Sequence, residues 1–482
     1  MTSRWLWAGV YLALLLLPVA IGVGAARVAG VEPRPWLDEW AAGLGMVGFA
    51  AVLLSFFLLG RFKLLSGVLG SDLLMQSHQL FARTAVLLLL LHPFFYSLWG
   101  AAPGPLDPSG ARSLRIEGGS WGLATGLLAL GCLLVLALTA VLREKSGLAY
   151  ERWRLMHSAL ALGVLGLGLH HTLVSGRYAQ LTPLALVWWT LAALALASWA
   201  WVYAVLPLLQ GARPFRVDLV RRCAEGIWLL QISAPGRRPL RFRAGQFAWL
   251  KLQQRWPHRD NPFSICNAPD AQGWVQFLIK EAGDMTRALP QCPVGATAYL
   301  DGPHGRFEIP ARARAVVMYA GGIGIAPFLS LLADCVARQD RRPIRLVYAD
   351  KCPAQMVDVA ALSGAESLHD FALLPMVEQA DAGWTGLNGR LDAAGLAQAW
   401  QQPGLTPGAD ATCHLVCGPE AMMDAVETAL TARGVPAAHI VSEHFKYDFA
   451  GRSPQARHMR LAWVGMSVAA LAGLVLALVW RF

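Results

Sequence analysis

Four histidines in two apolar segments are the residues whose type and spacing point to metal chemistry. His78 and His92 lie fourteen residues apart in one segment, and His157 and His171 lie fourteen apart in another. On an α-helix this spacing puts two imidazoles on nearly the same face, about 21 Å apart. Imidazole is an axial ligand of haem iron, and ionisable groups inside a membrane are usually functional. We therefore predict two stacked b-type haems, each held by one histidine from either helix, across a bilayer core roughly 30 Å thick.

A fifth histidine leaves one ligand open. His170 stands beside His171, so the spacing from His157 is thirteen or fourteen residues. On a straight helix thirteen residues turn the ring to the far side, which favours His171, whereas a bent helix would favour His170. Any one of these histidines alone would be explained as simply by a hydrogen bond to a neighbouring helix.

The composition places these histidines in a membrane. The chain of 482 residues is 55% hydrophobic and 15% charged, too apolar for an ordinary soluble protein and too long for one domain. The first apolar run could be a cleaved signal peptide, but it is longer than such signals usually are. The expected spans are Trp5–Gly24, Ala41–Gly60, Ser77–Trp99, Trp121–Leu142, Trp153–Leu173, Pro183–Leu206 and Leu461–Trp480.

Unequal charge on the connecting segments predicts the orientation. The more positive side carries Arg4, Arg61, Lys63, Arg143, Lys145, Arg152, Arg154, Arg213 and Arg216. The other side carries Arg27, Arg34, Arg112, Arg115 and Arg177. We expect an integral protein of a bacterial inner membrane, with residues 212–457 cytoplasmic and the C-terminus outside. His78 and His157 would then hold an inner haem, and His92 and His171 an outer one.

The remaining composition limits the partners. The net charge of +10 comes without a basic run interleaved with aromatic residues, so we expect lipid and not nucleic acid beside the basic side chains. The eight cysteines form no C-x-x-C pair and lack iron–sulfur spacing. A flavin is then the only obvious electron carrier for the soluble half.

The hydrophobic period changes along the chain and divides it into four expected domains. Residues 1–210 predict an all-α membrane bundle of six helices that holds the haems. Residues 211–312 have short strand-like runs, typical of a small antiparallel β-barrel. Residues 313–456 alternate strand and helix patterns, typical of a parallel α/β domain. Residues 457–482 predict one extra C-terminal transmembrane helix.

Two short sequences in the expected barrel could bind a flavin. An aromatic ring followed by a hydroxyl can cover and orient an isoalloxazine, although a proline turn is an alternative explanation; these residues are Asn261, Pro262, Phe263 and Ser264. A glycine, backbone N–H groups and a hydroxyl at a helix start suit a pyrophosphate. The second set comprises Lys280, Gly283 and Thr286.

Two further sequences follow predicted strands of the α/β domain. Glycines between a strand and a helix let a dinucleotide phosphate approach the backbone, and these are Gly321, Gly322 and Gly324, followed by Pro327. Cys417 and Gly418 come after another strand and would lie at the same edge of the sheet, where ligands bind. A core cysteine is the alternative for Cys417.

Taken in order, these sequences resemble the ferredoxin–NADP reductase module, and Gly302–Phe307 resembles the loop that joins its two domains. Together with the paired histidines, the chain over roughly residues 36–450 resembles the ferric reductase and NADPH oxidase superfamily. The resemblance implies that Phe263 stacks on FAD, that Ser264 contacts the flavin ring and that the glycine turn holds NAD(P)H. It also implies an aromatic near Phe445 or Phe449 over the flavin. Asn261 departs from the histidine that membrane oxidases of the family usually have there.

The combined expectation is transmembrane electron transfer from cytoplasmic NAD(P)H through FAD and two b-type haems to an acceptor outside. Oxygen reduced to superoxide is the first candidate acceptor, a ferric chelate the second, and a periplasmic redox protein the third. Lys351 weakly favours NADPH, whereas Asp350 at the same strand end would favour a free ribose hydroxyl. Arg177 could attract the acceptor or could be an ordinary interfacial arginine.

Overall fold

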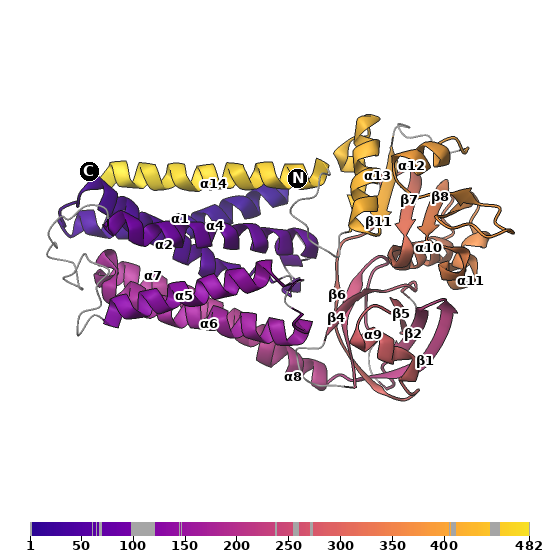
Figure 1. Cartoon of the computed structure of the whole chain (residues 1–482), viewed down its shortest axis with the longest axis horizontal. Helices are drawn as coiled ribbons and strands as arrows, with labels where there is room; N and C mark the ends of the chain where they lie inside the picture. Colours follow the sequence, from indigo (N-terminus) through magenta and orange to yellow (C-terminus); the bar gives the residue numbers. More distant parts are fainter. Residues whose placement is uncertain are drawn as a thin grey trace. The chain divides into compact units, whose positions relative to one another are not determined.

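A computed structural model of the whole chain shows two compact units (Figure 1). The helical unit comprises Met1–Leu69, Leu73–Val205 and Leu461–Phe482, and the sheet unit comprises Gly70–Asp72 and Leu206–Arg460. The structure describes residues 2–59, 61–63, 65–66, 70–97, 121–143, 145, 147–236, 239–253, 260–269, 273–403, 405, 411–443 and 454–481.

Long apolar runs form the helices of the first unit. They are α1 (Thr2–Val28), α2 (Trp36–Ser55), α4 (Ser71–Ser97), α5 (Trp121–Val141), α6 (Tyr150–Ser175), α7 (Thr182–Ala200) and α14 (Pro454–Arg481). Helix α7 continues through a π turn, Trp201–Val205, into α8 (Leu206–Gly211). Within the described ranges, seven helices are long and apolar enough to cross a membrane. Helix α2 begins five residues earlier than expected, because Pro35 precedes it and two acidic residues occupy its first turn.

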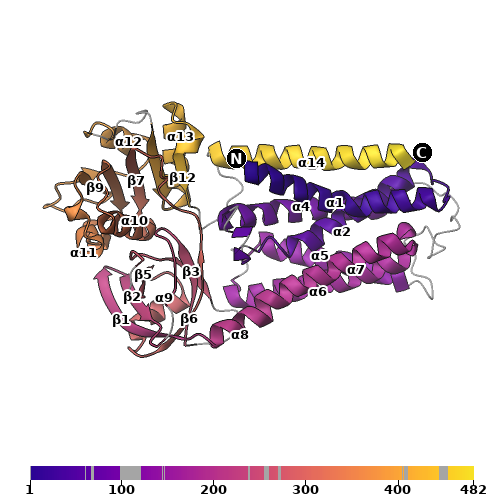
Figure 2. The same ribbon diagram turned by 180° about the vertical axis from the view of Figure 1, so that it is seen from behind.

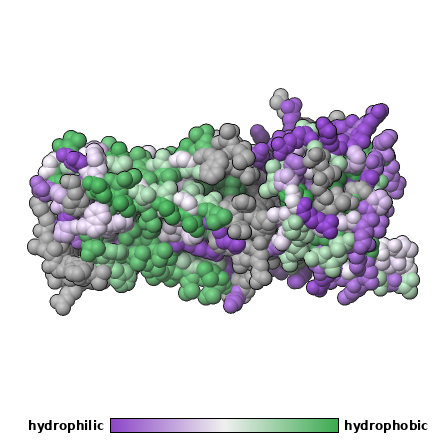
Figure 3. Space-filling model, turned by 90° about the horizontal axis from the view of Figure 1, so that it is seen from above, coloured by the Kyte–Doolittle hydropathy of each residue, from purple (hydrophilic) through white to green (hydrophobic). Residues whose placement is uncertain are grey.

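Helix α14 packs into the helical unit and lies beside α1 and α4 in both views (Figures 1 and 2). Leu474 fills the space over Gly43 on α2, where an added Cβ would lie 2.4 Å from its Cδ1. The Nε1 of Trp463 donates to the Thr84 hydroxyl at 3.0 Å. The last helix is therefore a packed member of the helical unit. The face of this unit seen in Figure 3 is mainly apolar, as a lipid-facing surface requires.

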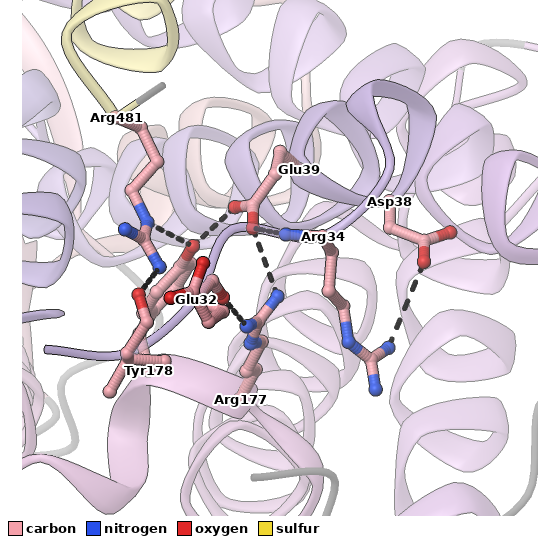
Figure 4. Close-up of polar contacts among 8 residues, drawn as sticks. Glu32, Arg34, Asp38, Glu39, Arg177, Tyr178 and Arg481 are labelled. Carbon is pink, nitrogen blue, oxygen red and sulfur yellow. Dashed lines mark hydrogen bonds and ion pairs between the residues drawn. The ribbon is translucent and has the colours of Figure 1, made fainter. Parts of the chain in front are cut away.

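A buried polar cluster joins three chain segments, which are the start of α2, the turn between α6 and α7 and the end of α14 (Figure 4). The carboxylate of Glu39, 1% exposed, accepts hydrogen bonds from the Arg177 guanidinium at 2.9 Å and from the Tyr178 hydroxyl. Arg481 of α14 donates to that same Tyr178 oxygen at 3.3 Å. Burial, and then the charge of Glu39, raises the pKa of Tyr178 to about 12, so its phenol stays protonated and donates. We call Glu39, Arg177, Tyr178 and Arg481 the Glu39 cluster.

The cluster corrects the expectation for Arg177. This side chain is 8% exposed and ion-paired, and its second terminal nitrogen donates to the Glu32 carbonyl at 2.6 Å. It is thus a buried, ion-paired side chain and not an exposed charge that could attract the acceptor. The sequence pattern showed the arginine but not its partner, because Glu39 lies 138 residues away along the chain.

Glu39→Ala should destabilise the helical unit. It leaves Arg177 buried without its carboxylate, a change that typically costs 3–5 kcal/mol. We expect the midpoint of thermal unfolding in detergent to fall by roughly 10 °C. Glu32→Ala is the matched control, because Glu32 is exposed and contributes only its backbone carbonyl. Equal midpoints for the two variants would contradict this assignment.

The first half of the sheet unit is antiparallel. Its strands are β1 (Phe215–Ala224), β2 (Ile227–Ser233), β3 (Phe247–Leu252), β4 (Asn261–Ser264), β5 (Val275–Lys280) and β6 (Thr297–His304), in the order β4-β3-β6-β1-β2-β5. The predicted barrel is not closed in the described residues: only a single bridge, Ile265 to Phe277, joins the two end strands. The physical reason is the length of β4, because its four residues offer little backbone for a ladder with β5.

The second half is a parallel sheet covered by helices on both faces, as expected. Its strands are β7 (Ala315–Gly321), β8 (Ile344–Asp350), β9 (Phe371–Val377), β10 (Leu387–Asn388), β11 (Thr412–Cys417) and β12 (Ile440–Ser442), in the order β10-β9-β8-β7-β11-β12. The covering helices are α10 (Ala326–Ala337), α11 (Val359–Ser363), α12 (Ala393–Ala399) and α13 (Glu420–Ala432). The strand order reverses between β7 and β11, and ligands bind at such a switch point.

Candidate functional site

Two of the histidines in the helical unit face each other. The ring centres of His92 on α4 and His171 on α6 are 6.3 Å apart. A metal bound by both rings would need about 2 Å to each nitrogen and roughly 1 Å more to each ring centre, or about 6 Å in total. The observed separation therefore fits one metal atom between the two imidazoles.

Hydrogen bonds leave the ligand nitrogens of these two rings available. The Nδ1 of His92 lies 2.7 Å from the Ala41 carbonyl on α2, and the Nδ1 of His171 lies 2.8 Å from the Gly122 carbonyl on α5. A carbonyl oxygen only accepts, so each Nδ1 carries the proton and each Nε2 keeps its lone pair. A backbone acceptor on the other ring nitrogen is the usual arrangement of a metal-binding histidine.

Glycines make room for both rings. A Cβ at Gly45 would lie 2.7 Å from the Nδ1 of His92, and a Cβ at Gly126 would lie 2.5 Å from that of His171. Each glycine stands one helical turn after the carbonyl that receives the hydrogen bond. Helices α2 and α5 therefore present the same device, a carbonyl followed by a glycine four residues later, to the helices that carry the histidines.

The second pair, His78 and His157, lies fourteen residues before the first pair on the same two helices. The Nδ1 of His78 is 3.2 Å from the Ser55 carbonyl on α2. Among the described residues no three His, Cys, Asp or Glu side chains converge as an ordinary cation site requires. Paired imidazoles instead suit an iron whose other four ligands come from a porphyrin.

His170 is placed differently from His171. It is exposed on the surface of the helical unit, and its Nδ1 lies 3.0 Å from the Thr125 hydroxyl. Only the His171 ring faces His92. Of the two alternatives left open by the spacing, the geometry favours His171 as the ligand.

The expected flavin residues Asn261 to Ser264 form strand β4 and not a proline turn. Ser264 is 6% exposed and pairs with Phe247 of β3. Phe263 is half-buried and packs against the core of the antiparallel sheet, with its ring 6.5 Å from Phe277.

In the second expected flavin-binding sequence, the Thr286 hydroxyl bonds to the backbone of the loop that precedes it. Its hydroxyl accepts from the backbone N–H groups of Ala282 at 2.8 Å and Gly283 at 2.9 Å, and it donates to the Gly283 carbonyl at 2.9 Å. These three bonds use the whole capacity of a hydroxyl. Thr286 therefore fixes the turn before α9 (Asp284–Ala288), which differs from the expected contact with a phosphate.

Glycine is required for two separate reasons in the turn after β7, which we call the nucleotide turn (residues 321–324). A Cβ at Gly324 would lie 2.4 Å from the Cys417 carbonyl, and one at Gly418 would lie 3.0 Å from the Gly321 Cα. These glycines let the turns after β7 and β11 touch. Gly322 instead has a φ of +52°, and only the Asp350 carboxylate comes within 4 Å of its Cβ position. Pro327 begins α10, where a missing N–H costs nothing.

Cys417 is fully buried at the end of β11. Burial, and then the nearby Glu443 carboxylate, raises the pKa of its thiol well above the ordinary value, so the thiol is neutral. The Glu443 backbone N–H donates to the Val416 carbonyl at 3.2 Å. Cys417 thus stands at the expected sheet edge beside a carboxylate that the sequence pattern did not reveal.

Several contacts link the sheet edge beside Cys417 to Phe247 on β3, the strand that pairs with β4. A Cβ at Gly305 would lie 3.0 Å from Phe247 and 3.1 Å from the Glu443 Oε1. The His304 ring lies 5.7 Å from the Phe247 ring, and its Nε2 is 3.2 Å from the Asp301 Oδ1. Sequence reasoning missed Phe247, His304 and Glu443 as site residues. An acidic residue directly after a parallel strand was a usable signal for Glu443.

At the end of β8, the charge nearest the nucleotide turn belongs to Asp350. Its Oδ1 accepts from the Lys351 N–H at 2.8 Å, while the Lys351 side chain is exposed. Burial raises the pKa of the Asp350 carboxyl, opposed by the Lys351 hydrogen bond and the charge of Lys280. Lys280 also reaches Gln355 at 3.4 Å, so it faces the nucleotide half. Phe445 lies outside the described residues.

Comparison with known proteins gives three family matches along the chain. Residues 44–168 match the family described as ferric reductase like transmembrane component. Residues 221–309 match the oxidoreductase FAD-binding domain, and residues 318–428 match the oxidoreductase NAD-binding domain. The fold and these matches define a membrane-embedded flavin oxidoreductase driven by NAD(P)H. The chain belongs to the ferric reductase and NADPH oxidase superfamily.

Curated relatives resemble the sheet unit. The anthranilate 1,2-dioxygenase electron transfer component of Acinetobacter baylyi is 31% identical over 43% of this chain and 59% of its own length. The ferredoxin–NAD(+) reductase component of the alkene monooxygenase system of Xanthobacter autotrophicus is 30% identical over 48% of this chain and 69% of its own. The NAD(P)H-flavin reductase of Aliivibrio fischeri is 27% identical, covering 32% of this chain and 67% of its own. This chain thus spans 59% of the first relative's length.

One solved structure, the ferredoxin reductase in carbazole 1,9a-dioxygenase, has a TM-score of 0.43 and 22% identity. The match covers 48% of this chain and 69% of the solved ferredoxin reductase chain.

Proposed function

We propose that this chain moves electrons from cytoplasmic NAD(P)H through FAD and two b-type haems to an acceptor on the far side of a bacterial inner membrane. The observation that carries the proposal is the facing of His92 and His171, 6.3 Å apart, with each Nδ1 hydrogen-bonded to a backbone carbonyl. Transfer from NAD(P)H through FAD follows from the family matches.

The helical unit would hold one haem between His92 and His171 and a second between His78 and His157. Bound haem supplies one-electron chemistry, which a hydride donor cannot supply alone. The carbonyls of Ala41, Gly122 and Ser55 fix the tautomers, so the Nε2 atoms are presented without a prior proton loss. With α2 and α5 packed against them, the apolar helices would exclude water from the rings.

In the sheet unit, residues of two halves would meet at the flavin. Ser264 would contact the ring and Phe263 would lie against it, with Lys280 and the turn fixed by Thr286 on the phosphate side. The turn Gly321–Gly324 would take the dinucleotide phosphates, and the neutral thiol of Cys417 would border the nicotinamide. Phe445 would cover the flavin, as the family resemblance implies. These residues bind and orient, and no acid or base is required.

The haem assignment predicts the number of haems that each chain binds. Purified protein should contain about two b-type haems per chain in a pyridine haemochrome assay. His92→Ala or His171→Ala should remove one, because each leaves a single imidazole for that iron. His170→Ala is the matched control and should retain both, since its ring faces Thr125. One haem in the intact protein, or a loss in the control, would contradict the assignment.

Oxygen is the proposed acceptor, which would yield superoxide. The family match to a ferric-reductase-like membrane domain supports a ferric chelate as the second candidate. Purified protein supplied with NAD(P)H, without iron or a partner, should produce superoxide that superoxide dismutase abolishes. Electron flow only on addition of a ferric chelate would select the second candidate. Flow that requires a separate periplasmic protein would select the third.

The geometry favours NADH over the NADPH suggested by Lys351. The Asp350 Oδ2 lies 4.0 Å from the Cβ position of Gly322, whereas the Lys351 side chain is exposed. A carboxylate at that strand end accepts from a ribose hydroxyl and repels a 2′-phosphate. The wild-type protein should therefore use NADH with the higher kcat/KM.

Asp350→Asn should raise the ratio of kcat/KM for NADPH to that for NADH by about tenfold, the effect of removing about 1.4 kcal/mol of repulsion. Asp358→Asn is the control, because it removes the same charge while an asparagine can still cap α11. Steady-state reduction of an artificial dye by the full-length protein measures both ratios. An unchanged ratio in Asp350→Asn would contradict the role.

A further inference from the structure

His157 is held differently from the other three histidines. Its Nδ1 is buried and has no hydrogen-bond partner in the part of the chain that the structure describes. The Nδ1 atoms of His78, His92 and His171 all lie within 3.2 Å of a carbonyl. Another contact must select the orientation of a ring without such a bond, because the χ2 torsion of histidine is broad and roughly two-fold.

The pairing of the helices shows where the missing acceptor would be. On α2 the acceptors for His92 and His78 are Ala41 and Ser55, fourteen residues apart like the histidines. On α5 the acceptor for His171 is Gly122, so the same spacing assigns Leu136 to His157. The Leu136 carbonyl accepts from the Thr139 hydroxyl at 3.0 Å, as the Gly122 carbonyl accepts from Thr125, but the His157 Nδ1 does not bond to it.

An aromatic ring occupies the place beside His157. The ring of Trp153, one helical turn earlier on α6, has its centre 5.1 Å from the His157 ring at an interplanar angle of 35°. This separation lies within the range of favourable aromatic pairs. Trp153 therefore contacts the face of the imidazole and restricts its rotation.

Trp153 is itself fixed by neighbours from other segments. Its Nε1 donates to the Thr139 carbonyl on α5 at 3.1 Å. The Arg143 guanidinium lies 5.0 Å from the Trp153 ring centre and 4.6 Å from that of Tyr150, which stacks on Trp153. Thr139, on the neighbouring helix α5, thus anchors the tryptophan with its carbonyl.

We propose that Trp153 is the positioning residue of His157, replacing by a tilted aromatic contact the backbone hydrogen bond that orients the other three ligands. The proposal rests on the proposed function, because it concerns how His157 is presented to the inner haem. It predicts that this haem has one ligand without an Nδ1 acceptor. Such a ligand donates less electron density, so the two haems should differ spectroscopically.

The test compares four full-length proteins: wild type, Trp153→Leu, Trp153→Phe and the control Trp463→Leu. Phenylalanine keeps the ring face but loses the bond to Thr139. Trp463 is a matched control because it is half-buried and also joins two helices through an Nε1 bond, to Thr84 at 3.0 Å. The readouts are haem per chain, the low-temperature EPR spectrum of the oxidised haems, and FAD content as a check of folding.

Trp153→Leu should lose about half of the haem, or keep two haems with a shifted EPR signal for one of them. Trp153→Phe and Trp463→Leu should match the wild type. If Trp153→Leu does not accumulate, Trp153→Met removes the ring while keeping an apolar chain and is judged by the same criteria. A ring-free variant identical to the wild type, or a Trp153→Phe as damaged as Trp153→Leu, would overturn the proposal. Fewer than two haems in the wild type would instead reject the proposed function.

Discussion

The arrangement of the helical unit depends on one interaction, the hydrogen bond between a backbone carbonyl and the Nδ1 of a histidine inside an apolar medium. Leaving such a group without a partner costs several kcal/mol, because no water is available to replace it. The carbonyls of Ala41, Ser55 and Gly122 provide this bond for three histidines. These bonds leave the Nε2 lone pair of each of the three rings free. Helices α2 and α5 thus orient the histidines of α4 and α6, and in the proposed function they decide which nitrogen would bind iron.

The sheet unit follows a comparable constraint at the meeting of β7 and β11. The turn after β7 must approach both a dinucleotide and the turn after β11, and a side chain at Gly324 would collide with the Cys417 carbonyl. Only Gly322 faces open space, next to the Asp350 carboxylate. The glycine-rich sequence is therefore shared between protein packing and nucleotide access, whereas its pattern alone suggests access only.

Features set by local spacing could be predicted from the sequence. The fourteen-residue spacing located two histidines that face each other, and the alternation of strands and helices located the parallel sheet and its glycine turn. Features that depend on distant partners could not. Arg177 is paired with a glutamate 138 residues away, and the closure of the barrel depends on how far a four-residue strand can pair. Thr286 was expected to contact a phosphate, but its hydroxyl is used by backbone groups within four residues of itself. Asn261, Phe263 and the remaining flavin residues keep their roles as proposals.

The central claim is that electrons cross the membrane, and sided vesicles test it most directly. The purified protein is reconstituted into sealed vesicles that contain cytochrome c, and NADH is added only outside. Molecules with the sheet unit outward should reduce the trapped cytochrome c, and His92→Ala, which removes a ligand of the outer haem, should abolish this without preventing reduction of a dye outside. Reduction confined to acceptors on the same side as NADH would contradict the account.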